Sequence, residues 1–236
     1  MIEWFQKIAP NVVTYWDRFV VSCESTFQMF LIAGSISFVL GLLFGTLLTV
    51  WKSDGIRPHK VMHMILNTAI NFFRAIPFLI LLIFLIPFTR TLVGTAIGVK
   101  GAIVPLIFGT VPFFTRQVET VLAGVDPGKI EAARSMGTGT AGIIFRVYLH
   151  EALPDLIRVT TVTAISLIGL TTMAGAVGAG GIGSFAINYG QNQNHPDIVN
   201  VCVIVLLAVT FVLQSLGNWL SKRTTNRSLF PIHRGR

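Results

Sequence analysis

Long apolar segments alternate with short polar connections along the whole chain. A helix that crosses the hydrocarbon core of a membrane needs about 20 largely apolar residues, because lipid offers no partner to unpaired backbone groups. Five segments meet this requirement, at about residues 25–51, 61–88, 101–121, 156–183 and 198–220. The pattern therefore predicts an all-α, polytopic membrane protein with five transmembrane helices.

The composition agrees with a membrane protein and excludes other classes. Hydrophobic residues fill 53% of the 236 positions and charged residues only 12%, whereas a soluble domain carries about 25% charged residues. The chain is therefore not an ordinary water-soluble enzyme, a disordered tail or a disulfide scaffold. Cys23 and Cys202 lie far apart and outside any metal-ligand spacing, so we expect both to pack as small apolar residues.

Basic residues are distributed unequally between the two sides of the predicted spans. Of eighteen Lys and Arg residues, twelve fall on one side and four on the other, and Arg74 and Arg116 lie within spans. Because cytoplasmic segments carry the excess of positive charge, we expect an extracytoplasmic N-terminal segment (residues 1–24) and a cytoplasmic basic tail (221–236). The net charge of +8 is thus explained by topology in the cell membrane and by contact with lipid headgroups, and nucleic acid is not needed as a partner.

The cytoplasmic connection at 122–155 is long enough for two short helices. Asp126 is a suitable N-cap and the following proline suits the first helical position. Gly137 falls where a left-handed residue ends the first helix, and a second helix is expected to stop before Pro154. Two interpretations remain open: the pair lies on the bilayer, or it docks a cytoplasmic partner.

This connection carries EAARSMG at Glu131–Gly137 and LHEALP at Leu149–Pro154. The two stretches resemble the EAA loop of binding-protein-dependent ABC importer permeases, in which EAA, three residues and a glycine precede an I-x-L-P ending. His150 stands where that family carries the proline, so Pro154 would end the second helix one turn later. The resemblance implies that the loop couples the chain to an ATPase through Glu131, Ala132, Ala133, Gly137, Leu149 and Pro154.

Three further stretches narrow the resemblance to the permease subunits of methionine importers. They are TTMAGAVGAGGIGSFAINYG at 171–190, FRAIPFLILL at 73–82 and VPFFTRQVE at 111–119. The resemblance implies a type I ABC importer permease fold, a homodimer, two ATP-binding subunits and an extracytoplasmic methionine-binding lipoprotein. It also implies a chain that is not itself an enzyme and binds no cofactor, with ATP and Mg²⁺ held by the partner ATPase.

Small residues dominate the fourth span, since thirteen of the twenty residues from 164 to 183 are Gly, Ala, Ser or Thr. Such residues let helix backbones approach closely in lipid, and they equally suit a helix that lines a passage for solute. The two roles remain open, and both can hold on different faces. The candidate translocation path consists of Thr171, Thr172, Met173, Gly175 and Gly178, with alternating access as the expected mechanism.

Charged residues inside spans are costly and often functional. Arg116 and Glu119 are three apart on one helical face and are expected to pair, as an inner-interface contact or a gate. For Arg74 we favour slightly a helix that begins near Asn71, so that Arg74 reaches the inner surface and Pro77 kinks the helix just above.

Other functions remain as alternatives to methionine import. One is an ABC permease for another small amino acid or solute. Another is a stand-alone secondary transporter, although such carriers usually hold an intramembrane acid or an inverted repeat, and five spans do not divide into equal halves. His59 and His63 share a helical face but have no third ligand nearby, so we expect no metal site.

Overall fold

The fold is a bundle of long helices, as seen in a computed structural model that describes residues 9–228, with side chains up to residue 225. No strand occurs within that range. Four helices are long and apolar enough to cross a membrane: α3 (Trp16–Trp51), α7 (Gly98–Ala123), α11 (Leu153–Gly175) and α13 (Pro196–Ser228). A fifth span is formed if the bent pair α4 (Lys60–Ala75) and α5 (Phe78–Phe84) counts as one. The all-α architecture expected from the apolar pattern is confirmed.

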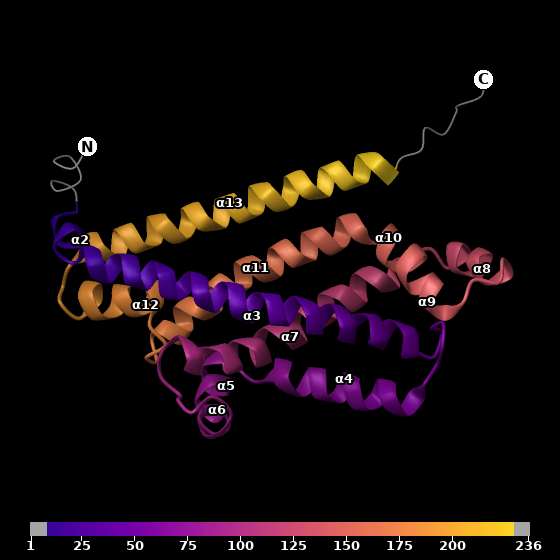
Figure 1. Cartoon of the computed structure of the whole chain (residues 1–236), viewed down its shortest axis with the longest axis horizontal. Coiled ribbons are helices and arrows are strands. Elements are labelled where there is room, and N and C mark those ends of the chain that lie inside the picture. Colours follow the sequence, from indigo (N-terminus) through magenta and orange to yellow (C-terminus); the bar gives the residue numbers. More distant parts are fainter. Residues whose placement is uncertain (1–8, 229–236) are drawn as a thin grey trace.

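Short helices gather at the two ends of this bundle (Figure 1). One end holds α8, α9 and α10, and the opposite end holds α2 and α12. Their bounds are α2 Pro10–Thr14, α6 Ile86–Val93, α8 Pro127–Ser135, α9 Thr140–Gly142, α10 Leu149–Glu151 and α12 Gly181–Phe185, with π-helical segments η1 Ile143–Tyr148 and η2 Ala186–Gln191. Of the basic tail expected at 221–236, residues 221–228 continue α13, and residues 229–236 lie outside the described residues.

The helices α3 and α7 share the most extensive contact in the described part of the bundle, and two glycines of α3 lie within it. A methyl group at Gly45 would lie 2.6 Å from the Cβ atom of Val118, and one at Gly41 would lie 2.5 Å from the ring of Phe114. Both glycines are buried, so the two backbones approach more closely than any larger residue would allow. This spacing of small residues at every fourth position is the packing motif that lipid-embedded helices use.

The fourth span differs from the sequence prediction of 156–183, because α11 ends at Gly175. The chain then turns, with positive φ at Gly178, Gly180 and Gly181. It turns back into α12, which packs against α3 and α11. Hydropathy could not detect this turn, because the segment carries no charge and no proline.

The second span is broken rather than continuous. α4 and α5 meet at an angle of 105°, and the break falls at Ile76 and Pro77, whose ring is incompatible with a continuing helix. The kink expected at Pro77 is therefore present. A helix that begins near Asn71 is wrong, because α4 begins at Lys60, and Arg74 lies exposed in its last turn.

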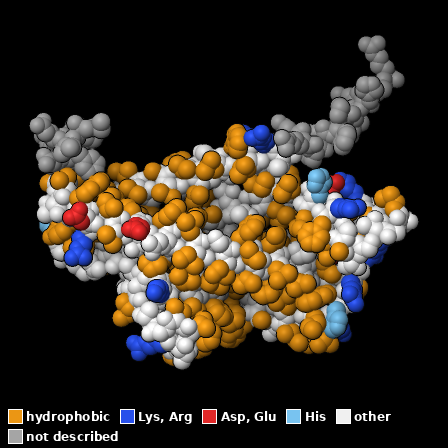
Figure 2. Space-filling view, viewed as in Figure 1, with side chains coloured by type: hydrophobic (Ala, Val, Ile, Leu, Met, Phe, Trp, Pro, Cys, Tyr) orange, Lys and Arg blue, Asp and Glu red, His pale blue; other side chains and the backbone are white. Residues whose placement is uncertain are grey.

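The surface agrees with a bundle surrounded by lipid. Hydrophobic side chains cover the middle of the molecule in a broad band, and charged side chains gather toward its two ends (Figure 2). The helices α3, α11 and α13 contribute many exposed apolar side chains to this surface, such as Phe27, Val162 and Phe211. In water such a surface would favour association, whereas in a bilayer it faces the acyl chains.

Candidate functional site

The segment that resembles the EAA loop, residues 126–152, forms a compact helical unit at one end of the bundle. The carboxylate of Asp126 accepts a hydrogen bond from the backbone N–H of Gly128 at 2.8 Å and so caps α8. Pro127 occupies the first helical position. Gly137 has φ 76°, and its N–H donates to the carbonyl of Arg134 at 2.9 Å. The start and end of this helix are as the sequence predicts.

The three residues of the EAA motif point in different directions. Ala133 is buried, whereas Glu131 and Ala132 are exposed. Ala133 belongs to a buried cluster that joins α7, the helical unit and the start of α11. Its members are Phe114, Val118, Leu122, Val125, Ala133, Ile143, Tyr148, Ala152 and Leu156. Burial raises the pKa of the Tyr148 phenol, so this side chain stays neutral within the cluster. The unit is thus packed on the bundle as one body.

The second half of the unit runs through η1 and α10 and ends before Pro154, as expected. Leu149 packs against the same buried cluster. Pro154 lies in the first turn of α11, and its carbonyl accepts from the hydroxyl of Ser221 at 3.2 Å, which ties α11 to α13. An ion pair of 2.5 Å between Lys129 and Glu151 spans the two halves of the unit.

The helical unit exposes two large apolar side chains. Met136 is 78% exposed and Phe145 is 69% exposed. The motif does not single out either residue, because Met136 is one of its three unspecified residues and Phe145 lies between its two stretches. Both residues belong to the helical unit at one end of the bundle, which also exposes Glu131, so this unit offers a surface on which another protein could pack.

Arg134 links α8 to the connection that precedes α4. Its guanidinium donates to the backbone carbonyls of Gly55 and Ile56, at 3.3 and 2.9 Å. These two carbonyls lie in the loop between α3 and α4, where they take no part in the backbone hydrogen bonds of a helix. The helical unit therefore contacts two parts of the bundle, the buried cluster and this loop.

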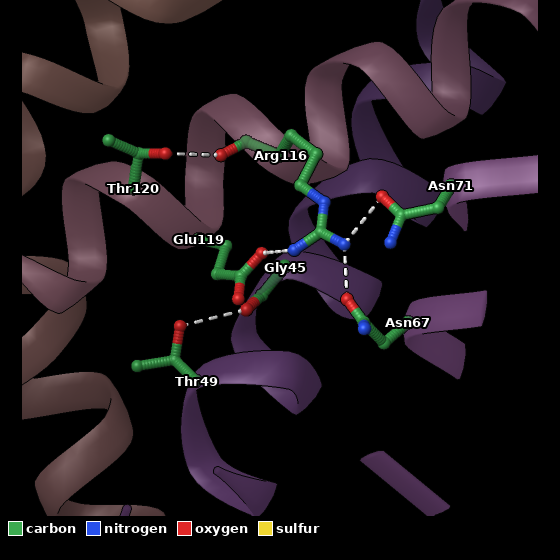
Figure 3. Close-up of polar contacts among 7 residues, drawn as sticks. All are labelled: Gly45, Thr49, Asn67, Asn71, Arg116, Glu119 and Thr120. Atoms are coloured by element: carbon green, nitrogen blue, oxygen red, sulfur yellow. Dashed lines mark hydrogen bonds and ion pairs between the residues drawn. The ribbon is translucent and has the colours of Figure 1, made fainter. Parts of the chain in front are cut away.

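Arg116 and Glu119 pair as predicted, and the structure adds partners from α4 (Figure 3). Arg116 Nη1 lies 2.5 Å from Glu119 Oε2. Arg116 Nη2 donates to Asn71 Oδ1 at 2.8 Å and also to Asn67 Oδ1. Both side chains are mostly shielded, with exposures of 22% for Arg116 and 17% for Glu119. The guanidinium thus joins α7 to α4.

The two asparagines were not predicted, although the sequence holds a signal for them. His63, Asn67, Asn71 and Arg74 recur at intervals of three or four residues, which places them along one face of a helix. The apolar pattern of the second span obscures this stripe. Only the fold shows that the stripe meets Arg116 of α7.

The residues of the candidate translocation path do not share one surface. Thr171 is buried, and its hydroxyl donates to the carbonyl of Ile168 at 2.7 Å, whereas the exposed Met173 reaches the surface of the chain. Gly175 is also buried, because a methyl group there would lie 2.5 Å from the backbone nitrogen of Ser184 in α12. Gly178 is exposed, and Thr172 is half-buried. Packing and surface roles are therefore divided among these residues.

Among the side chains that the structure describes, those of residues 9–225, no three His, Cys, Asp or Glu residues form a group that could bind a metal ion. The ring of His59 instead caps α4, accepting from the backbone N–H of Met62 at 3.3 Å. Cys202 is buried and Cys23 half-buried, both as free thiols in the apolar cluster near α2 and α12.

The chain is similar to several transport permeases. It is 37% identical over 222 residues to the probable D-methionine transport system permease protein MetI of Vibrio cholerae, covering 92% of this chain and 99% of that protein. It is 42% identical to the methionine import system permease protein MetP of Bacillus subtilis, covering 74% of this chain and 79% of the relative.

Solved structures show the same fold. An inward-facing structure of the MetNI methionine ABC transporter contains a chain 37% identical to this one, with a TM-score of 0.86 over 89% of this chain and 98% of that chain. An amino acid ABC transporter, solved with histidines, is 18% identical with a TM-score of 0.74 over 91% of this chain and 98% of that chain. Residues 28–226, most of the chain, match the binding-protein-dependent transport system inner membrane component. With its four long apolar helices, the bent pair α4 and α5, and its helical unit at one end, the chain belongs to this family.

Proposed function

We propose that this chain is the membrane-spanning permease subunit of an ATP-driven importer that carries D- or L-methionine across the cell membrane. The observation that carries the proposal is the capped helical unit at 126–152, packed on a buried cluster at one end of an apolar bundle. The similarity to methionine permeases over most of the chain supports the substrate.

Two copies of the chain and two separate ATP-binding subunits form the proposed transporter. ATP and Mg²⁺ bind to the ATPase subunits, whose closure moves the helical unit. The exposed side chains of Met136 and Phe145 are the proposed apolar contact with the ATPase, and Glu131, exposed on α8, adds a carboxylate to the same helical unit. Because Ala133 and the cluster around it are buried, movement of the unit is passed to α7 and α11 as a displacement of packed helices, and the spans alternate between inward-open and outward-open forms.

The substrate path is proposed to lie between the two copies. Met173, 44% exposed, and Gly178 are the path candidates that reach the surface of the chain. Thr171 and Gly175 support this surface from the interior. A wall of small residues and a thioether, with few charges, suits a small and partly apolar zwitterion such as methionine.

The end of the bundle that holds α2 and α12 is proposed to face outward and to receive the methionine-binding lipoprotein. Polar contacts fix this end: Tyr15 donates to Gln193 at 2.9 Å, and Asn11 donates to Asp197 at 3.0 Å. Exposed amides at Asn188 and in the turn after η2 offer hydrogen bonds to a partner. The N-terminus then lies outside and the C-terminus in the cytoplasm.

Reconstitution tests the proposal. The chain is purified with its ATPase subunits, placed in liposomes and supplied with the lipoprotein and labelled methionine. We expect uptake only when ATP and the ATPase are present. The control is the same chain reconstituted alone, for which we expect no uptake. Methionine uptake by the chain alone would show a self-sufficient carrier, and ATP-driven uptake of a different solute in preference to methionine would overturn the substrate.

A further inference from the structure

The helix α4 is only lightly packed on the rest of the bundle. Of its sixteen residues, all described, only Ile70 is buried. At its C-terminal end the break at Ile76 and Pro77 turns the chain by 105° and separates α4 from α5. Apart from Ile70 and an edge-to-face contact between the rings of Phe73 and Phe108 of α7, whose centroids lie 5.0 Å apart, little apolar burial fixes α4, so polar contacts contribute to its attachment.

The first of these contacts is the guanidinium of Arg116. Its two terminal nitrogens reach Glu119 on its own helix and Asn67 and Asn71 on α4 (Figure 3). Since the two asparagines lie one helical turn apart, this planar fork fixes both the distance and the rotation of α4 relative to α7. Glu119 balances the charge of Arg116, which makes the arginine tolerable within a span. A lysine would keep the charge but not the fork.

The second contact is that of Arg134 with the carbonyls of Gly55 and Ile56. That loop leads directly into α4, which begins at Lys60. Two arginines thus hold α4, one near its middle and one at the loop before its start. Both arginines belong to the stretch formed by α7 and α8, which the buried side chains of Val118, Leu122 and Ala133 join into one body.

We propose that Arg116 and Arg134 are positioning residues that transmit the movement of the helical unit to α4, which swings about the break at Ile76 and Pro77. This inference rests on the proposed function, because it assumes that an ATPase moves the unit. A merely static role for the two arginines differs in its consequence: their removal would lower the stability of the complex but leave unchanged the methionine imported per ATP hydrolysed.

The test measures methionine uptake and ATP hydrolysis together, in liposomes that contain the complete complex. For Arg116→Met and for Arg134→Ala we expect continued ATP hydrolysis and a fall of about tenfold in methionine imported per ATP, as in other coupling networks. Arg116→Lys should recover only part of this ratio. The matched control is Lys100→Met, which removes an exposed cation from the same helix α7 and should leave the ratio unchanged.

Further variants keep the test decisive. If Arg116→Met does not assemble, the double variant Asn67→Leu, Asn71→Leu removes the contact with α4 while Arg116 and Glu119 still pair, and the same loss is expected. Arg134 is exposed, so its alanine variant should assemble in any case. The inference is overturned if methionine imported per ATP hydrolysed is unchanged in Arg134→Ala and is also unchanged in either Arg116→Met or the double asparagine variant. If Gly137→Val still lowers the ratio, the proposed function stands and only the role of the arginines fails.

Discussion

At the scale of single residues, Gly137 shows how one backbone conformation shapes the proposed coupling surface. Its φ of 76° lies in the left-handed region, and a methyl group there would meet no atom within 4 Å. A side chain at this position would therefore have space, and its cost would come from the backbone alone. The turn after Gly137 sets the angle between α8 and the helices that follow.

We expect Gly137→Val to lower methionine uptake per ATP hydrolysed by about tenfold, because the left-handed conformation costs ~1–2 kcal/mol for a side-chain-bearing residue and the turn would rearrange. Membrane insertion should be normal. The measurement is uptake and ATP hydrolysis in liposomes. Gly139→Val is the matched control, because Gly139 has φ −67° and equally open surroundings. If methionine uptake per ATP hydrolysed is equal in Gly137→Val, in Gly139→Val and in the unchanged protein, the loop at 122–155 is not the coupling element.

At the scale of elements, the short helix α12 depends on one hydroxyl of another helix. Thr26 of α3 accepts a hydrogen bond from the backbone N–H of Ile182 at 2.8 Å, in a buried position. The N–H groups in the first turn of a helix have no partner within that helix, and this one has no access to water. The hydroxyl thus fixes where the chain turns back after α11.

We expect Thr26→Val to destabilise the protein by ~1–3 kcal/mol, the cost of leaving a buried donor unpaired. The volume of the side chain hardly changes, so the loss reports on the hydrogen bond. The measurement is the thermal midpoint of the purified complex in detergent. Thr46→Val on the same helix is the control, since its hydroxyl only donates to the carbonyl of Leu42 within α3; a similar loss in both variants would contradict this role.

Sequence reasoning found the elements that depend on local chemistry and missed those that depend on distant contacts. The caps of α8 at Asp126 and Gly137 were predicted because cap and turn preferences act over a few residues. The pairing of Arg116 with Glu119 was predicted from helical spacing alone. The contact of Arg116 with Asn67 was not predicted, because it depends on which helices pack together. The turn after Gly175 was not predicted either, because it lies in an uncharged segment whose hydropathy is that of a continuous span.

At the scale of the whole molecule, the distribution of charge predicts the orientation of the bundle. Relative to the predicted spans, twelve of the eighteen basic residues of the sequence are assigned to the side that carries the connection at 122–155, and cytoplasmic segments carry such an excess. The loop at 52–59, which follows α3, and the turn at 192–195, which precedes α13, lie at opposite ends of the bundle. The two ends should therefore differ in their access to a reagent that cannot cross the membrane.

Single cysteines placed at these two ends test the orientation. In a background with Cys23 and Cys202 replaced by alanine, we expect Asn192→Cys to react with an impermeant maleimide in intact cells. Ser53→Cys should react only after the membrane is opened or in inside-out vesicles. Both positions are exposed, so a difference in labelling reflects sidedness rather than burial, and labelling in opened membranes supplies the control for reactivity. The reverse pattern would place the helical unit outside, where no cytoplasmic ATPase could reach it, and would refute ATP-driven coupling through that unit.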